Sequence, residues 1–138
     1  RGEALPSIIS ISRFTMTSKT KQAEHAWVLS CLGGQCEEVK PAQHPQGTTN
    51  QVRDLFFNTP ARRRFLKTDR TEFLRVDDLI KRVSLSRFDI GFTLIHNGKT
   101  VRSTQGGDQE SNKKMRITQL CGKDFFDNAF SIFASVLY

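Results

Sequence analysis

The chain has 138 residues and a formal net charge of +7, from 21 Lys and Arg against 14 Asp and Glu. This length supports one domain with a hydrophobic core, and no apolar run predicts a signal peptide or a membrane span. The three cysteines are an odd number without a Cys-x-x-Cys spacing. A zinc site or disulfide framework is therefore not expected. The cysteines instead indicate a protein of a reducing compartment. The positive charge favours a polyanionic partner such as a nucleic acid.

The first half of the chain predicts strands joined by turns. Apolar and polar residues alternate over 9–16, which indicates a strand buried on one face. A second apolar run, over 27–29, is followed by Gly33-Gly34, a pair typical of a hairpin turn. After a loop rich in proline, a further strand is predicted over 49–57.

The clearest helix is predicted over 69–88. Asp69 and Glu72 have the spacing of a capping box, in which side chains satisfy the free amide groups of the first turn. Five apolar side chains then recur at helical spacing and should pack on a sheet, so that a charge at Ile80 would be costly. These five are Phe73, Val76, Leu79, Ile80 and Val83.

A second hairpin is predicted over 90–102, with its turn at Asn97-Gly98, because this dipeptide tolerates the positive φ angles of a type I′ turn. The polar stretch that follows, including residues 105–114, has the composition of a linker. Residues 115–138 then predict a short helix and a strand at the end of the chain. This tail is too short to form a domain by itself.

Two separated stretches carry the most information about function. The chain begins with the sequence RGEAL at residues 1–5, and GTT at 47–49 is followed by NTPARRR at 58–64. Together and in this order, the stretches resemble the ATPase region of the MutL family of DNA mismatch repair proteins. The resemblance continues through the long helix and the second hairpin, so it spans almost the whole chain.

The resemblance implies an α+β fold, with an antiparallel sheet and helices packed on one face, as part of a Bergerat-type ATPase sandwich. Residues 1–104 would be the C-terminal part of the ATPase domain, and 105–114 a linker. Residues 115–138 would begin a second α+β domain, the ribosomal S5-like transducer domain. The chain is expected to be an internal fragment of a longer bacterial protein, cytoplasmic and associated with the nucleoid.

The same resemblance assigns nucleotide contacts. The family's first motif closes over the triphosphate of ATP, and its counterparts here are Arg1, Gly2, Glu3, Ala4 and Leu5. Gly2 would let the main chain approach a phosphate, and Arg1 would offer a charged fork. Thr48 matches a threonine that helps to hold the adenine through water. From the residues alone, residues 1–5 can also be an ordinary helical chain start, and a threonine that opens a strand is the favoured explanation of Thr48.

The implied parent protein binds and hydrolyses ATP with Mg²⁺, forms a homodimer and couples mismatch recognition to strand excision. Its partners would be DNA, a MutS-like recognition protein and a downstream nuclease or helicase. The family's catalytic Glu, Mg²⁺-binding Asn and second-domain Lys match nothing in the chain. The fragment is therefore expected to be inactive, with no catalytic or metal-binding residue of its own and no bound cofactor.

Two alternatives remain open from the sequence. A basic α+β nucleic-acid-binding module without a nucleotide site explains the charge and the hairpins equally well. The arginines at 62–64 either contact DNA or, the more ordinary explanation, pair with acids such as Asp54 or Glu72. Consecutive helical or turn side chains cannot all face one partner, so one or two of them at most would share a surface.

Overall fold

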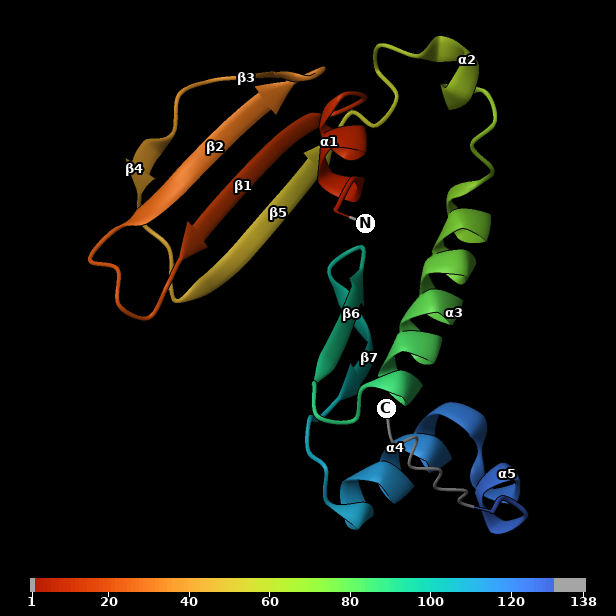
Figure 1. Ribbon diagram of the computed structural model, residues 1–138. Helices are drawn as coiled ribbons and strands as arrows, with labels where there is room; N and C mark the ends of the chain where they lie inside the picture. Colours follow the sequence, from red (N-terminus) through yellow and green to blue (C-terminus); the bar gives the residue numbers. More distant parts are fainter. Residues whose placement is uncertain (1, 131–138) are drawn as a thin grey trace, which may run out of the picture. The chain divides into compact units, whose positions relative to one another are not determined.

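The computed structural model describes residues 2–130 and divides the chain into two compact units, with the boundary between Leu66 and Lys67 (Figure 1). The first unit is built on an antiparallel sheet, and the second combines helices with a two-stranded hairpin. The predicted α+β class, with an antiparallel sheet and helices, is therefore confirmed. Within the described residues, no helix is long and apolar enough to cross a membrane.

The sheet of the first unit has the strand order β3-β2-β1-β5, and β4 also pairs with β2. The central strand β1 is antiparallel to both of its neighbours and contributes Phe14, which is 1% exposed, to a small core with Ala26 and Cys31. The elements of this unit are α1 (Ala4–Ile9), β1 (Arg13–Lys19), β2 (Ala26–Leu32), β3 (Gln35–Cys36), β4 (Lys40–Ala42), β5 (Gly47–Arg53) and α2 (Pro60–Arg63).

The strand predicted over 9–16 is wrong in its first half. Helix α1 occupies residues up to Ile9, and strand β1 begins only at Arg13. Pro6 is compatible with this helix because it lies in the first turn, where the amide groups have no partner inside the helix. The alternation of apolar and polar residues therefore includes a helix end and a turn. In residues 9–12 it does not indicate a strand.

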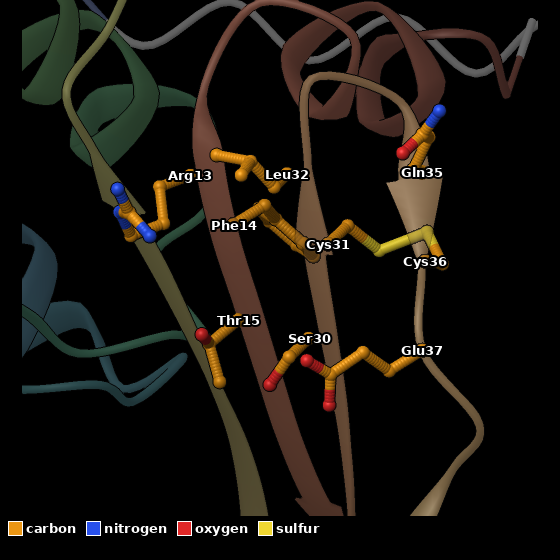
Figure 2. A pocket seen from close by; sticks show the side chains of 9 residues that line it. All are labelled: Arg13, Phe14, Thr15, Ser30, Cys31, Leu32, Gln35, Cys36 and Glu37. Atoms are coloured by element: carbon orange, nitrogen blue, oxygen red, sulfur yellow. A yellow bond between two sulfur atoms is a disulfide. The ribbon is translucent and has the colours of Figure 1, made fainter.

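The hairpin turn predicted at Gly33-Gly34 is confirmed, with φ angles of 57° and 94°. Behind the turn, Cys31 faces Cys36 as a strand pair, and their sulfur atoms form a disulfide (Figure 2). The Leu32–Gln35 pair closes the two-residue turn, so the cysteines occupy the adjacent non-hydrogen-bonded pair, where side chains are closest. The expectation of no disulfide was wrong because the count of cysteines says nothing about strand register.

Strand β5 begins at Gly47 and ends at Arg53, four residues before the predicted end at Phe57. Asp54 and Phe56 have φ angles of 51° and 64°, in the left-handed region. An extended strand cannot continue through such residues, so the chain turns here. The apolar run that suggested a longer strand is part of this turn.

The helix predicted over 69–88 is confirmed as α3, with slightly different ends. Its cap is Thr68 rather than Asp69: the main-chain N–H of Thr71 donates to the Thr68 hydroxyl at 3.3 Å. The carboxylate of Glu72 instead accepts from the N–H of Lys67 at 3.0 Å. The second unit consists of α3 (Asp69–Ser86), β6 (Phe92–His96), β7 (Lys99–Thr104), α4 (Glu110–Cys121) and α5 (Lys123–Asp127).

The buried side of α3 differs from the predicted apolar stripe. Val76, Leu79 and Val83 are 45%, 58% and 36% exposed, whereas the buried residues of the helix are Asp77 and Ser84. The ring of Phe73 stacks on the ring of His96 in β6, with centroids 4.0 Å apart. The helix therefore packs against the β6–β7 hairpin through a face that mixes apolar and polar residues.

The turn at Asn97-Gly98 is confirmed, with φ angles of 49° and 75°. Helix α4 begins at Glu110, so the last five residues of the predicted linker 105–114 are helical. The predicted domains, 1–104 and 115–138, stay a prediction. The two compact units are defined by contacts inside this chain and do not test where the domains of a longer protein begin and end. The strand predicted over 129–138 lies outside the described residues from 131 onward, and residues 129–130 are not in a strand.

Candidate nucleotide-contacting segments

The residues expected to contact phosphate lie at and before the start of α1. Arg1 is outside the described residues, and Gly2 to Leu5 are exposed. Gly2 has a φ of 67°, and a Cβ at this position would meet no heavy atom within 4 Å. Glu3 occupies the N-cap position without making a side-chain hydrogen bond to the helix. The first amide groups of α1 are therefore not capped by this side chain.

Helix α1 depends on its surroundings for its position. It has six residues, and none of them is buried within the described structure. Isolated helices of this length are unstable in water, because nucleation is costly and few hydrogen bonds follow it. The stretch that leaves the helix, residues 8–12, is therefore the part that determines where α1 lies.

The tip of the β2–β3 hairpin holds this exit from one side. The N–H of Gly34 donates to the carbonyl of Ile9 at 3.0 Å, and the N–H of Gly33 donates to the carbonyl of Ser12 at 3.1 Å. A Cβ on Gly34 would lie 3.7 Å from the Cα of Ser10, so the two main chains approach closely. The glycine pair thus serves both the turn and this contact.

The turn that follows β5 holds the exit from a second side. The side-chain amide of Asn58 donates to the carbonyl of Ser10 at 2.9 Å, and the N–H of Phe56 donates to the carbonyl of Ile11 at 2.7 Å. We call residues 8–12, the Gly33–Gly34 tip and the Phe56–Asn58 turn the α1 junction. In the sequence, the glycines indicate a turn and Asn58 belongs to the NTPARRR stretch. Only the fold brings these residues together.

Thr48 lies in β5 opposite Ser18 of β1, and their hydroxyl oxygens are 2.7 Å apart. At the other end of this strand pair, Arg13 pairs with Arg53, and α1 precedes Arg13 (Figure 1). Along β1, Arg13 and Ser18 are separated by roughly 17 Å at about 3.3 Å per residue. The two predicted groups of contacts therefore lie at opposite ends of the β1–β5 pair and not beside each other.

A pocket of about 510 Å³ opens on the three strands β1, β2 and β3 (Figure 2). It contains neither Thr48 nor the residues at the start of α1. Arg13, at its edge, forms an ion pair with Asp54 at 3.2 Å. The lining residues are Arg13, Phe14, Thr15, Ser30, Cys31, Leu32, Gln35, Cys36 and Glu37. This pocket is separate from the predicted nucleotide contacts.

The arginines at 62–64 lie in and just after the short helix α2, and all three are exposed. The acids expected to pair with them have other partners: Asp54 pairs with Arg13, and Glu72 pairs with Arg75 at 3.6 Å. The predicted pairing with Asp54, in the same unit, is therefore not observed, and pairing with Glu72, in the second unit, stays a prediction. Their side chains face solvent in the first unit.

The second unit contains two arginine networks that the sequence did not indicate, one partly buried and one buried. In the first, the guanidinium of Arg102 on β7 donates two hydrogen bonds to the carboxylate of Asp77 on α3. This hydrogen bonding lowers the pKa of Asp77 below its ordinary value of 3.8, against the opposing effect of burial. The pair joins the helix to the hairpin.

In the second network, Arg116 of α4 is 3% exposed and donates to four main-chain carbonyls. Three of these hydrogen bonds measure 2.8 to 2.9 Å. The carbonyls belong to Ser84, Arg87, Ile90 and Gln105. A single side chain thereby joins α4 to the end of α3 and to both ends of the β6–β7 hairpin.

Among residues 2–130, no group of three or more His, Cys, Asp and Glu side chains is placed to hold a metal ion. The acidic residues named above are instead engaged with arginines, as Asp54 is with Arg13 and Asp77 is with Arg102.

Comparison with solved structures identifies the class of fold. The Aquifex aeolicus MutL ATPase domain complexed with ADP matches with a TM-score of 0.79 and 34% identity, over 86% of this chain and 48% of that chain. No protein-family model matches the chain. The fold is thus that of part of a bacterial MutL ATPase domain.

Sequence relatives give the family. The DNA mismatch repair protein MutL of Shewanella frigidimarina is 52% identical over 96% of this chain, and that of Haemophilus influenzae strain PittGG is 48% identical over the same share. These matches cover 22% and 21% of the two proteins, so the chain spans about a fifth of the length of the curated relatives it matches. Over this stretch, the chain belongs to the MutL family of DNA mismatch repair proteins.

Proposed function

We propose that this stretch contributes nucleotide contacts to a MutL-type ATPase, which uses ATP to couple mismatch recognition to strand excision. The observation that carries the proposal is the similarity to the Aquifex aeolicus MutL ATPase domain complexed with ADP, at 34% identity over 86% of this chain. In the bacterial cytoplasm, its partners would be DNA, a MutS-like protein, a downstream nuclease or helicase and a second copy of itself.

The proposed phosphate contacts are Arg1, Gly2, Glu3, Ala4 and Leu5. Main-chain amides that no side chain caps are suited to phosphate oxygens, and Gly2 leaves open space beside the main chain. Pro6 has no N–H, so the donors would lie before it. The guanidinium of Arg1 would add a charge-assisted contact.

Thr48 is the proposed adenine-side contact. The Ser18 hydroxyl donates to the carbonyl of Gly47 at 3.4 Å, so the Thr48 hydroxyl donates to Ser18 and its oxygen stays free to accept a hydrogen bond. The pair could therefore hold a water molecule that bridges to the base. Its place at the far end of the β1–β5 pair from α1 agrees with contacts to the two ends of an extended nucleotide.

Mg²⁺ would neutralise phosphate charge when bound with ATP. The family's catalytic Glu and metal-binding Asn have no match in this sequence. We therefore expect the 138-residue stretch by itself not to hydrolyse ATP. Hydrolysis that depends on Mg²⁺, measured with the purified stretch, would contradict this expectation.

The test is ATP binding by the complete gene product that contains the stretch, with Thr48→Val compared against the neighbouring Thr49→Val. Side chains alternate along a strand, so Thr49 faces the opposite side of β5. Loss of one hydrogen bond predicts roughly three- to tenfold weaker ATP binding for Thr48→Val and little change for the control. A complete protein that binds no ATP would overturn the proposal.

A nucleic-acid-binding module without a nucleotide site is the second candidate. The net charge of +7 and the exposed arginines at 62–64 favour it. Such a module binds DNA with an affinity that falls steeply as salt rises, because neutralised phosphates release counterions. DNA binding of this kind by the complete protein, with no response to ATP, would favour the module over the ATPase.

A further inference from the structure

We propose that Asn58 is a positioning residue, whose side-chain amide holds the exit of α1 and thereby places the segment that contacts phosphate. The inference rests on the proposed nucleotide contacts at residues 1–5. It gives a physical role to the asparagine of the NTPARRR stretch, which lies far from these residues in the sequence. Asn58 itself touches the main chain of Ser10 and not the nucleotide.

The first step is that the exit of α1 is hydrogen-bonded at every residue from Ile8 to Ser12. Each carbonyl from Ile8 to Ser12 accepts a hydrogen bond that fixes the direction in which the chain leaves the helix. The donors are the Ser12 hydroxyl, the N–H groups of Gly34, Phe56 and Gly33, and the Asn58 amide. Because five consecutive carbonyls are hydrogen-bonded, the main chain of residues 8–12 is held in one conformation. This conformation determines the position of α1.

The second step is that the junction is maintained against unfavourable main-chain conformations. Phe56 has a φ of 64°, which is a true outlier for a bulky side chain, and Asp54 has a φ of 51°. Such residues persist where their surroundings determine them, and they cluster at functional sites. Here the conformation of Phe56 directs its N–H to the carbonyl of Ile11 at 2.7 Å.

The third step identifies Asn58 as the contact that substitution can change without altering the main chain. Apart from the local Ser12 hydroxyl, the other donors of the junction named above are main-chain amides. A Cβ on Gly33 would lie 3.3 Å from Nδ2 of Asn58, so the amide rests against the hairpin tip as well as the Ser10 carbonyl. This one side chain therefore connects all three segments of the junction.

The experiment compares three variants of the complete gene product. Asn58→Asp replaces the donor with a carboxylate that faces the Ser10 carbonyl, and Asn58→Ala removes the donor without adding charge. Asn50→Asp is the matched control, because Asn50 is exposed on β5 and the change in charge is the same. Two quantities are measured: the Kd for ATP, and the rate of amide hydrogen exchange in α1 without nucleotide.

We expect both Asn58 variants to bind ATP roughly three- to tenfold more weakly and to exchange the α1 amides faster by a similar factor. The melting midpoint should stay close to that of the unchanged protein, because Asn58 is exposed and its loss opens no cavity. The control should match the unchanged protein in every measurement.

The outcomes separate this inference from the proposed function. Wild-type ATP affinity in both Asn58 variants would overturn the positioning role and leave the nucleotide contacts standing. If the unchanged protein binds no ATP, the proposed function fails, and hydrogen exchange alone decides whether Asn58 positions α1. Unchanged exchange in the Asn58 variants would then overturn the inference, and faster exchange would support it.

Discussion

The two units of the chain are held together in different ways. In the first, the decisive contacts are main-chain hydrogen bonds: strand pairs, a glycine turn and the series of bonded carbonyls at the exit of α1. In the second, two arginine side chains join the elements. Arg102 binds a carboxylate, and Arg116 binds four main-chain carbonyls.

The difference concerns how much one side chain can destabilise each unit. Main-chain contacts are shared over many residues, and few substitutions remove one without changing the turn. A buried guanidinium, in contrast, satisfies several groups at once, so its loss leaves them all without a donor. We therefore expect the largest effects of single substitutions in the second unit.

The largest effect is expected for Arg116→Met. The methionine roughly matches the apolar part of the side chain but leaves four carbonyls without their donor, and we expect a loss of about 4 kcal/mol in the free energy of unfolding. Urea denaturation measures it. Arg70→Met, at an exposed position in the first turn of α3, should change stability by no more than about 0.5 kcal/mol. Equal effects at the two positions would contradict the network.

Asp77→Asn should follow, with a loss of about 2 to 3 kcal/mol, because a partly buried guanidinium loses its counter-charge. The adjacent Asp78 is the control: it is exposed and pairs with Arg82 at 2.8 Å, so Asp78→Asn should cost less than about 1 kcal/mol. Urea denaturation at neutral pH compares the two variants.

The pH dependence sharpens the same comparison. The hydrogen bonds from Arg102 keep the pKa of Asp77 in the fold below its ordinary value of 3.8. The carboxylate therefore contributes its full stabilisation above that value, and the contribution is lost as the pH falls through the lower pKa of the folded state. Between pH 5 and 2, stability should fall less steeply in Asp77→Asn than in Asp78→Asn. Parallel curves would contradict this assignment.

The disulfide gives a smaller expected effect in the first unit. Cys31 and Cys36 are five residues apart, and closing so short a loop is worth about 2 kcal/mol in the chain-entropy account. Cys36→Ser should lose this amount under oxidising conditions and should remove the response to a reductant. Cys121→Ser is the control, because this thiol is free and exposed. A response to reductant that persists in Cys36→Ser would contradict the pairing.

The smallest expected effect is the difference in stability between alanine substitutions in two glycine turns. Gly33 and Gly98 both have positive φ angles, of 57° and 75°, so alanine at either costs about 1 kcal/mol in conformational energy. A Cβ on Gly33 would also lie 3.1 Å from the ring of Phe57, whereas one on Gly98 meets nothing within 4 Å. Gly33→Ala should therefore be more destabilising by up to about 1 kcal/mol, as measured by thermal unfolding. Equal losses of stability would show that the Gly33–Gly34 tip can move away from Phe57 without cost in free energy.

Much of the local structure was predictable, for reasons specific to each element. The Gly33-Gly34 and Asn97-Gly98 turns follow from the need for positive φ angles, and α3 follows from a long run of helical spacing. The end of β5 and the start of β1 were misplaced, because apolar residues also occur in turns and short helices whose position depends on distant contacts.

The candidate site was predictable only as a set of residues. Thr48 and the start of the chain were identified by resemblance, and their contacts with nucleotide stay predictions. The role of Asn58 had no signal of its own, because a side-chain amide can donate to any carbonyl within reach. Its partner, Ser10, is 48 residues away in the sequence, and only the fold selects it.

The sequence by itself determined the family, the α+β class and the turns, since these depend on residue identity and on spacing of a few positions. The tertiary structure decided which side of α3 is buried, where α1 is held and what the buried arginines bind. Sequence patterns assign charged residues to solvent, because burying a charge without partners is costly. Asp77 and Arg116 are buried nonetheless, because the fold supplies those partners from other elements.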